Sequence, residues 1–429
     1  MKLCTRKICF DILNTADVTS KYEKIIDRHK NFIDLNSRDK AFVKVLILTF
    51  FRWNRSIEKI INKYSKKKSE KKIINILRIA VTQILFMRTA DYSAVNISVS
   101  LSKKFGSNIS RFVNAILRQI CRDKQEILKS LKSEENIPDW IFKNWKKNFS
   151  SNSAIKFAHQ SLKEPFLDIK IKKEFFKKRN WSKLFDGKPL FGELIRKNNS
   201  GLIEELPFFS SGYWWVQSAA STIPVTIIEN YFKKISPKIL EIGSAPGGKT
   251  LQLCENNFDV TAVEISKKRA VKLKENLSRT KFNVKLINED FNKWKSKQKY
   301  DCVLIDAPCS GSGVINKQPD ILYFKRKLNL ENLISKQEKL LKKSLRFLKK
   351  NGLLVYSVCS LISEESKDIV YKTLKENKGF SLLKLDGKLI NNIRVKIIDG
   401  MLYSTPTCYQ NKGGMDGFFV SCMIKGEKN

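Results

Sequence analysis

The second half of the chain alternates short apolar runs with polar stretches of helix length. The runs lie at residues 239–242, 260–265, 284–287, 302–305 and 353–356. Continuous apolar strands of this length are typical of a mostly parallel sheet with helices on both faces. We therefore predict an α/β domain over residues 211–429, with any ligand bound at the carboxyl ends of its strands.

The first 130 residues have the pattern of a different architecture. Apolar residues recur at the spacing of a helix with one buried face, for example at positions 109, 112, 113, 116, 117 and 120. Ser37 is a candidate N-cap for one of these helices, with Asp39 in its first turn. This periodicity predicts an all-helical domain over residues 1–130.

Residues 131–210 mix both patterns. Between residues 140 and 149, aromatic residues are interleaved with lysines, and residues 167–172 alternate apolar and polar as a strand does. Aromatic rings among lysines can stack on bases beside phosphates. The same pattern also fits a helix with an aromatic face in the core and solvated lysines. We predict a small α+β subdomain and leave its role in RNA binding open between these two interpretations.

The chain carries 82 Lys and Arg against 42 Asp and Glu, a formal net charge of +40. A field of this sign attracts nucleic acid. The excess is mostly lysine and extends over all three segments, so it does not locate a binding site. Apolar runs are too short to span a bilayer, and the first residues lack the apolar core of a signal peptide. We expect a cytoplasmic protein without a membrane segment.

The nine cysteines contain no Cys-x-x-Cys pair, and the chain has only two histidines, His29 and His159. These counts argue against a zinc site, and we expect no metal. Most of the thiols should be small buried groups, as is usual in a reducing compartment.

A glycine-rich loop follows the first predicted strand and admits two interpretations. It consists of Gly243, Ser244, Ala245, Pro246, Gly247, Gly248, Lys249 and Thr250. This order fits the phosphate-binding loop of nucleotide hydrolases, with Asp306 as a candidate magnesium ligand. Acids at three successive strand ends favour S-adenosylmethionine instead, because Glu264 can bind a ribose, Asp290 an adenine edge, and the loop a methionine moiety.

Cys309 and Cys359 each follow a predicted strand, so both thiols can face one pocket if those strands are neighbours. A thiolate that adds to C6 of cytosine makes C5 nucleophilic enough to attack a sulfonium methyl group. The second thiol can assist the later elimination, and Asp306 can hold the N3 and N4 edge of the ring. Lys249 is a candidate for lowering the pKa of the nucleophile.

The run 239–250 and the segments around Cys309 and Cys359 resemble the RNA cytosine-C5 methyltransferases. The helical front is similar to that of the bacterial Sun/RsmB type, 16S ribosomal RNA methyltransferases with a NusB-like N-terminal domain. The segments that carry this likeness lie at residues 36–41, 77–86, 112–118, 216–221 and 415–420. The resemblance implies a Rossmann-like class I methyltransferase domain at residues 211–429 and a NusB-like domain at residues 1–130.

The resemblance also implies roles for single residues. Cys359 would be the nucleophile and Cys309 would assist release, while the loop Gly243 to Lys249 with Glu264, Asp290 and Asp306 would contact S-adenosylmethionine. The implied partner is unassembled or partly assembled 16S ribosomal RNA, and the implied state is a monomer. The sequence departs from the family pattern at Ser244, Glu264 and Val358, where Ala, Asp and Thr are usual. A nucleotide hydrolase and a non-catalytic RNA-binding assembly factor are the alternatives.

Overall fold

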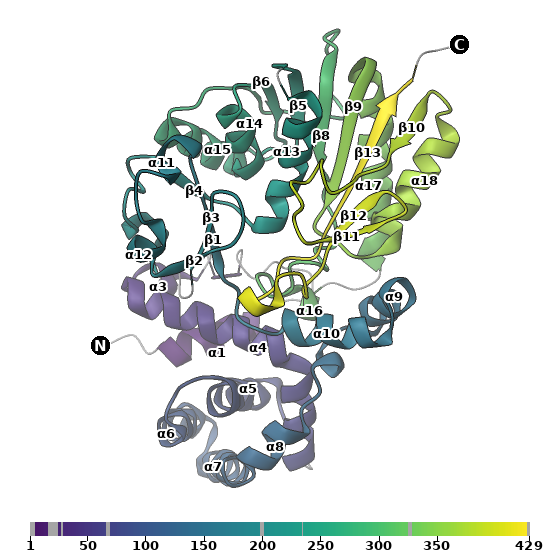
Figure 1. Ribbon diagram of the computed structural model, residues 1–429. Coiled ribbons are helices and arrows are strands. Elements are labelled where there is room, and N and C mark those ends of the chain that lie inside the picture. The colour runs from purple at the N-terminus through teal and green to yellow at the C-terminus, as the bar shows by residue number, and fades with distance from the viewer. Residues whose placement is uncertain are drawn as a thin grey trace. The chain divides into compact units, whose positions relative to one another are not determined.

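The computed structural model describes residues 5–15, 25–26, 29–65, 69–197, 201–233, 235–324 and 328–426 (Figure 1). The chain divides into two compact units. The first comprises Met1–Lys163 and Ile315–Arg326, and the second comprises Glu164–Val314 and Lys327–Asn429. Residues 131–210, which we predicted as one subdomain, contribute helices to the first unit and a small sheet to the second.

The first unit is helical throughout its described part. Its α-helices are α1 (Thr5–Thr15), α3 (Lys30–Ile33), α4 (Ser37–Tyr64), α5 (Lys71–Phe86), α6 (Asp91–Ser102), α7 (Ser107–Arg122), α8 (Lys124–Ser130), α9 (Asp139–Phe149), α10 (Ser151–Ser161) and α16 (Ile321–Phe324). The predicted cap of α4 is wrong by one residue. Asn36 is the N-cap, and its side chain accepts a hydrogen bond from the Asp39 amide at 2.8 Å. Both Asn36 and Ser37 are good capping residues, so their types alone do not decide between them.

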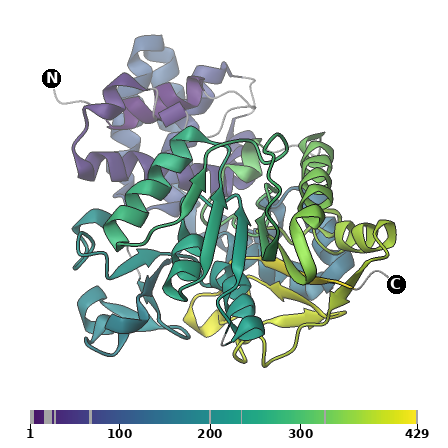
Figure 2. The ribbon, with the colours of Figure 1, turned by 90° about the horizontal axis from the view of Figure 1, so that it is seen from above.

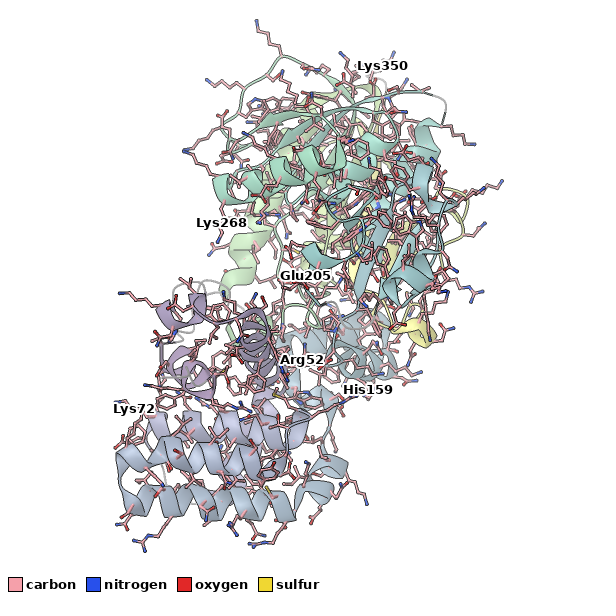
Figure 3. The ribbon with its side chains drawn as sticks, turned by 90° about the vertical axis from the view of Figure 1, so that its left-hand side faces the viewer. Arg52, Lys72, His159, Glu205, Lys268 and Lys350 are labelled. Atoms are coloured by element: carbon pink, nitrogen blue, oxygen red, sulfur yellow. The ribbon has the colours of Figure 1, made fainter. Side chains whose placement is uncertain are left out.

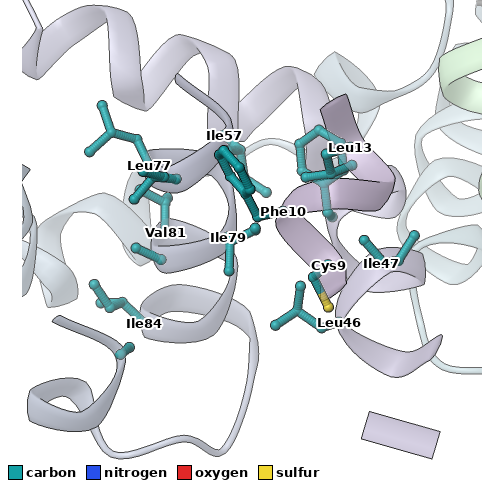
Figure 4. Packing of buried hydrophobic residues seen from close by; sticks show 14 of the residues in the cluster. Cys9, Phe10, Leu13, Leu46, Ile47, Ile57, Leu77, Ile79, Val81 and Ile84 are labelled. Carbon is teal, nitrogen blue, oxygen red and sulfur yellow. The ribbon is translucent and has the colours of Figure 1, made fainter. Parts of the chain in front are cut away.

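The core of this unit forms where α1, α4 and α5 pack together, as Figure 4 shows for residues such as Phe10, Leu46, Ile57 and Leu77. These side chains are at most 4% exposed. Each helix supplies one apolar face at the three-four spacing of the sequence, so burial of these faces stabilises the bundle.

A segment from the second half of the sequence completes this bundle. The Tyr323 ring of α16 lies 5.8 Å from that of Phe50 and 5.2 Å from that of Phe51. The guanidinium of Arg52, which Figure 3 labels, donates a hydrogen bond to the Asn316 carbonyl at 3.0 Å. Ile315–Arg326 therefore belongs to the helical unit, although it follows the Cys309 loop in the chain.

The aromatic-lysine pattern of residues 140–149 is a helix with an aromatic side in the core. Trp145 of α9 is fully buried, and its ring meets that of Phe157 edge-on at 5.8 Å. Phe149 also packs on Phe157, at 5.3 Å. Lys143 and Lys146 are exposed. For these rings the structure favours the core interpretation over base stacking.

The second unit begins with a small antiparallel sheet of order β2-β3-β1-β4. Its elements are β1 (Leu167–Ile171), α11 (Lys173–Phe176), α12 (Trp181–Phe185), β2 (Gly187–Pro189), β3 (Leu194–Lys197) and β4 (Trp214–Val216). The strand predicted at residues 167–172 is β1. The buried Arg196 guanidinium of β3 binds the Asp168 carboxylate of β1 at 2.7 Å, which ties the middle of this sheet together.

The main sheet has the order β11-β12-β13-β9-β8-β5-β6-β7, with β10 paired to β13. Its strands are β5 (Lys238–Ile242), β6 (Asp259–Val263), β7 (Lys285–Ile287), β8 (Tyr300–Asp306), β9 (Leu348–Val358), β10 (Phe380–Leu383), β11 (Lys396–Ile398), β12 (Met401–Ser404) and β13 (Phe418–Lys425). Strands β5 to β9 are parallel, at the five predicted runs. Strands β10 to β13 add an antiparallel extension.

Helices cover both faces of this sheet, as Figure 1 and the view from above in Figure 2 show. Helices α13 (Ala219–Phe232), α14 (Gly248–Glu255) and α15 (Lys267–Thr280) pack on one side. Helices α17 (Leu328–Ser344) and α18 (Lys367–Glu376) pack on the other. Because β5, β6, β7, β8 and β9 run the same way, the loops after them meet at one edge, which we call the carboxyl edge.

Within the described ranges, no helix has the length and apolar character needed to cross a membrane. The same part of the chain holds no group of three or more His, Cys, Asp or Glu residues arranged to bind a metal ion.

Candidate active site

Two cysteines meet at the carboxyl edge. Strands β8 and β9 pair in parallel, and their register places Asp306 beside Ser357. Cys309 and Cys359 therefore leave the sheet side by side, and their sulfur atoms are 3.2 Å apart. Both residues are half-buried. The sequence placed each cysteine after a strand, and the pairing of β8 with β9 brings the two thiols into contact.

The contact changes the acidity of Cys309. Its hydrogen bond with Cys359 raises the pKa of the Cys309 thiol well above the usual value, and burial raises that pKa further. Cys309 therefore stays protonated at neutral pH. A protonated Cys309 thiol at 3.2 Å can donate a hydrogen bond to the Cys359 sulfur.

The loop between β5 and α14 turns sharply next to β8. Gly243 has φ of +81°, and a Cβ atom there would lie 2.5 Å from the Asp306 carbonyl oxygen, so only glycine fits without strain. Four residues later, Gly247 has φ of +113°. The hydroxyl of Ser244 is buried and has no hydrogen-bond partner within the described structure. An orphaned buried hydroxyl in a tight glycine loop fits a bound polar ligand, because such groups are normally paired.

The three predicted acids lie at the carboxyl ends of β6, β7 and β8. Glu264 follows β6, is 1% exposed, and accepts hydrogen bonds from the amides of Ala245 at 3.2 Å and Ser266 at 2.9 Å. Asp290 follows β7 and accepts from the Asn292 amide at 2.9 Å, within its own turn. The structure thus joins Glu264 to the glycine loop, whereas the hydrogen bond of the Asp290 carboxylate is local.

The third acid, Asp306, ends β8 and forms an ion pair with Lys249 of α14, with Nζ and Oδ2 2.7 Å apart. The Lys249 side chain is buried and that of Asp306 is about one-third exposed. The Lys249 ammonium also lies 5.3 Å from the centre of the Phe418 ring. Lys249 therefore neutralises Asp306 at the place where the loop, β8 and the start of β13 meet.

Thr250 is unsuited to the magnesium-binding role that a nucleotide hydrolase requires. Its fully buried hydroxyl donates to the Glu241 carboxyl group at 2.6 Å and lies 3.2 Å from the Ser244 carbonyl oxygen. Burial raises the pKa of Glu241 to about 8. A phosphate-binding loop needs this hydroxyl on Mg²⁺, and here it is committed to the protein interior.

Two segments that the sequence singled out also meet at the site. The Ser218 hydroxyl donates to the carboxylate of Asp416, which precedes β13. The next residue, Gly417, donates its amide to the Gly313 carbonyl at 2.7 Å, and the Gly313 amide donates to the Cys359 carbonyl at 3.1 Å. The segment before β13 therefore supports the loop that follows Cys309.

Sequence reasoning missed Glu365, which follows Cys359 in the turn η5 (Ser363–Glu365). Its side chain is fully buried, and its carboxylate accepts from the hydroxyls of Ser310 and Ser360, each at 2.6 Å. These serines directly follow the two cysteines. The available signal was the pair of Cys-Ser dipeptides, but a contact between such distant segments cannot be read from local patterns.

A basic cavity of about 580 Å³ lies elsewhere in the second unit, between the β7–β8 connection and the end of α17. Its cations are Lys293, Lys295, Lys299, Lys339, Lys342, Lys343 and Arg346, and none of its lining side chains is acidic. The rings of Trp294 and Phe347 stack at 5.3 Å beside them. Desolvation lowers the pKa of Lys343. This combination suits a polyanion better than a neutral ligand.

The chain matches two family models. Residues 233–424 match the 16S rRNA methyltransferase RsmB/F model, and residues 4–122 match the NusB family model. Curated relatives cover most of its length. The probable ribosomal RNA small subunit methyltransferase B of Bacillus subtilis (strain 168) is 25% identical over 99% of this chain and 99% of its own. The ribosomal RNA small subunit methyltransferase B of Photorhabdus laumondii is 26% identical over 91% of this chain and 92% of its own.

Solved structures share the fold. The crystal structure of PH0851 aligns over 99% of this chain and 100% of its own, with a TM-score of 0.74 and 20% identity. NSun6 from Pyrococcus horikoshii, crystallised with SFG, aligns over 68% of this chain and 99% of its own, with a TM-score of 0.56 and 20% identity. Residues 233–424 are therefore similar to the 16S rRNA methyltransferase RsmB/F family and residues 4–122 to the NusB family, and the chain is an S-adenosylmethionine-dependent methyltransferase with an N-terminal NusB-like domain.

Proposed function

We propose that this protein transfers a methyl group to C5 of a cytosine in ribosomal RNA through a covalent bond between Cys359 and C6. The observation that carries the proposal is the pair of sulfur atoms 3.2 Å apart at the ends of adjacent parallel strands. C5 of cytosine is a weak nucleophile, so the reaction needs a thiolate that adds to C6 and leaves again. S-adenosylmethionine supplies the electrophilic methyl group.

Cys359 is the better candidate for attack. Cys309 stays a thiol because the contact with Cys359 and burial both raise its pKa. The Cys359 thiolate adds to C6, and the electrons of the C5–C6 double bond make C5 nucleophilic. C5 then takes the methyl group, which leaves C5 with one hydrogen to lose. The Asp306 carboxylate, paired with Lys249, supports the polar edge of the ring during these steps.

Cys309 assists release by moving a proton. Elimination removes the C5 proton, restores the C5–C6 double bond and breaks the bond between C6 and the Cys359 sulfur. The Cys309 thiol gives its proton to the departing Cys359 sulfur at 3.2 Å and accepts the C5 proton in return. Cys359 then loses its proton to solvent, which restores the starting pair. The proton balance of the reaction closes without any further group.

For the methyl donor we propose the glycine loop and the acids of the carboxyl edge. The unpartnered Ser244 hydroxyl and the tight turn at Gly243 fit a ligand that approaches the loop backbone. Glu264 is buried beside the Ala245 amide and is placed to accept from ribose hydroxyls. Asp290 is proposed for the adenine end of the ligand, because it follows the next strand of the sheet.

The RNA is proposed to be 16S ribosomal RNA, unassembled or partly assembled, because the RsmB-type relatives are named for the small ribosomal subunit. The basic cavity around Lys339 and Arg346 is a candidate contact for its phosphates. The target cytosine must be unstacked, since a thiol reaches C6 only from above the ring. A cytoplasmic monomer remains our prediction for the working form.

Two cysteine variants test the mechanism. Cys309→Ala should accumulate RNA bound covalently to the protein, because attack remains while release is slowed. Cys359→Ala should form no adduct and no methylated product. The adduct is measured on a denaturing gel after incubation with an in vitro 16S RNA transcript and S-adenosylmethionine. Full methyl transfer by Cys359→Ala would contradict the proposal. The buried Cys302→Ala, on β8 but with its side chain in the core, is the control.

The substrate requires a separate experiment. Bisulfite sequencing of ribosomal RNA from cells with and without the gene should show one protected cytosine that loses protection. If all small-subunit cytosines are unchanged, the RNA proposed here is wrong, whatever the chemistry of the two cysteines.

A further inference from the structure

A single buried carboxylate connects the two cysteine loops. Glu365 Oε1 accepts a hydrogen bond from the Ser310 amide at 2.7 Å, and Oε2 accepts from the hydroxyls of Ser310 and Ser360 at 2.6 Å each. Ser310 follows Cys309 and Ser360 follows Cys359. The residues next to both sulfur atoms are therefore held by the same group.

Neighbouring polar groups complete this cluster. The Gln337 amide of α17 donates to Glu365 Oε1 at 3.2 Å and to the Pro308 carbonyl at 2.9 Å. The Ser312 hydroxyl accepts from the Leu361 amide at 3.1 Å and lies 3.0 Å from the Ser360 hydroxyl. The loop after Cys309 is thus fastened to the loop after Cys359 at several points, with the Glu365 carboxylate at the centre.

The hydrogen-bond donors to this carboxylate are one backbone amide, two hydroxyls and one side-chain amide. Burial of a carboxylate among neutral donors costs free energy, and a neutral side chain could fill the same space at a lower cost. An ionised carboxylate offers acceptors only, which suits four converging donors. A glutamine would turn an amide group toward some of them.

The two cysteines depend on Glu365 to different degrees. Cys359 directly follows the long strand β9, and the turn η5 that carries Glu365 comes next in the same stretch of chain. The Tyr356 hydroxyl of β9 donates to the Glu365 carbonyl at 2.8 Å, which fixes that turn to its own strand. Cys309 belongs to the separate loop after β8. Loss of the carboxylate should therefore displace Cys309 relative to Cys359, with little effect on Cys359 itself.

We propose that Glu365 is the positioning residue that holds Cys309 against Cys359 for the release step. This inference rests on the proposed cytosine-C5 chemistry. The buried carboxylate of Glu365 then acts in the release step, whereas the geometry of β9 positions Cys359 for its attack on C6. The Glu365 charge also contributes to the raised pKa of Cys309, and so helps to keep that thiol protonated.

The variant Glu365→Gln separates the two halves of the reaction. Multiple-turnover methylation should fall by about 10- to 100-fold, the range that applies to residues that orient the ligands of a metal site from the outer shell. Methyl transfer into the first covalent adduct should stay close to the wild-type rate, since the geometry of β9 places Cys359. The adduct should accumulate on a denaturing gel with 16S transcript, as for Cys309→Ala. A residue that merely supports folding would lower adduct and product together.

Two further variants keep the result decisive. Glu364→Gln changes the neighbouring exposed carboxylate and should leave turnover and adduct at wild-type levels. Ser310→Ala removes one hydroxyl donor without a change of charge and should give the same accumulation to a smaller extent. If Glu365→Gln does not fold, as judged by thermal unfolding, Ser310→Ala decides the question.

The outcomes distinguish this inference from the reaction on which it rests. If Cys309→Ala traps an adduct but Glu365→Gln and Ser310→Ala do not, Glu365 has no role in release and the inference is overturned. If Cys309→Ala itself traps nothing and still methylates RNA, the proposed mechanism fails first. Adduct in all three variants supports both.

Discussion

Lys249 and Asp306 join the cofactor loop to β8, the strand that precedes Cys309, with 2.7 Å between Nζ and Oδ2. Lys249 was expected to act on the acidity of the nucleophile. The structure pairs its ammonium with Asp306, the acid that we propose for the polar edge of the cytosine ring, and its effect on the nucleophile stays a prediction. The ion pair is the point at which the methyl-donor loop and the base-binding strand are coupled.

The variant Lys249→Met should leave Asp306 without its cation and reduce methylation by about 100-fold, within the range for loss of a positioned polar group. Thermal unfolding should show a loss of stability, because one member of a largely buried pair then remains unpaired. The double variant Lys249→Met with Asp306→Asn should recover part of the stability and none of the activity. Lys268→Met on α15, at an exposed position labelled in Figure 3, is the control. Equal stability of the single and double variants would refute this coupling.

Gly243→Ala should weaken binding of S-adenosylmethionine by about 5- to 30-fold, because a left-handed φ costs an alanine about 1–2 kcal/mol. The added Cβ would also lie 2.5 Å from the Asp306 carbonyl oxygen, which forces the loop away from β8. Calorimetric titration with S-adenosylmethionine measures the effect. Gly379→Ala, where an added Cβ meets nothing within 4 Å, should bind as the wild type does.

The raised pKa of Glu241 predicts a pH-dependent stability. Burial raises this pKa from 4.5 to about 8, so between those values the folded protein keeps a proton that the unfolded chain has lost. The contribution of Glu241 to stability is therefore complete below pH 4.5 and is lost progressively as pH rises toward 8. Urea unfolding at pH 6 and pH 8.5 should show a larger decrease in the free energy of unfolding for the wild type than for Glu241→Gln. The control Glu275→Gln, at an exposed position, should keep the pH dependence of the wild type. If Glu241→Gln also keeps it, Glu241 is not the group responsible.

The basic cavity predicts how RNA binding depends on salt. Replacing Lys339, Lys342 and Arg346 together by Gln should weaken binding of a 16S transcript. The plot of log K against log salt has a negative slope, and its magnitude should decrease by about 2 if each cation neutralises one phosphate. Fluorescence anisotropy between low and moderate salt measures this slope. The same triple replacement at the exposed Lys375, Lys378 and Lys384 is the matched control. Equal losses for both triples would mean that the general charge of +40, and not this cavity, attracts the RNA.

Local pattern was sufficient for much of the architecture. The runs at residues 239–242 and 302–305 became β5 and β8 because buried parallel strands are apolar throughout, which is visible in the sequence. The order of the strands was not visible in this way. The contact of Cys309 with Cys359 depends on the pairing of β8 with β9. From the sequence, the contact could be predicted only on the assumption that these two strands are neighbours. The antiparallel strands β10 to β13 were also missed, since their pairing is with distant segments.

The candidate site shows the same limit. Cys309, Cys359, Glu264 and Asp306 could be proposed from the sequence because their residue types suit the chemistry and they lie at or just after the ends of predicted strands. Glu365 was not, because a carboxylate in a turn gives no sign that it is buried among hydroxyls from another loop. The proposed boundaries at residues 130 and 210 remain predictions about folding units.

The placement of Ile315–Arg326 has a consequence for any attempt to take this enzyme apart. The chain leaves the Cys309 loop, enters the helical bundle where Tyr323 packs on Phe50 and Phe51, and returns to the methyltransferase sheet. A truncated protein that starts after the bundle would retain this excursion with its apolar side uncovered. The NusB-like region therefore cannot be removed by a single cut in the sequence. Such a cut would leave Ile315–Arg326, which belongs to the helical unit, attached to the methyltransferase domain.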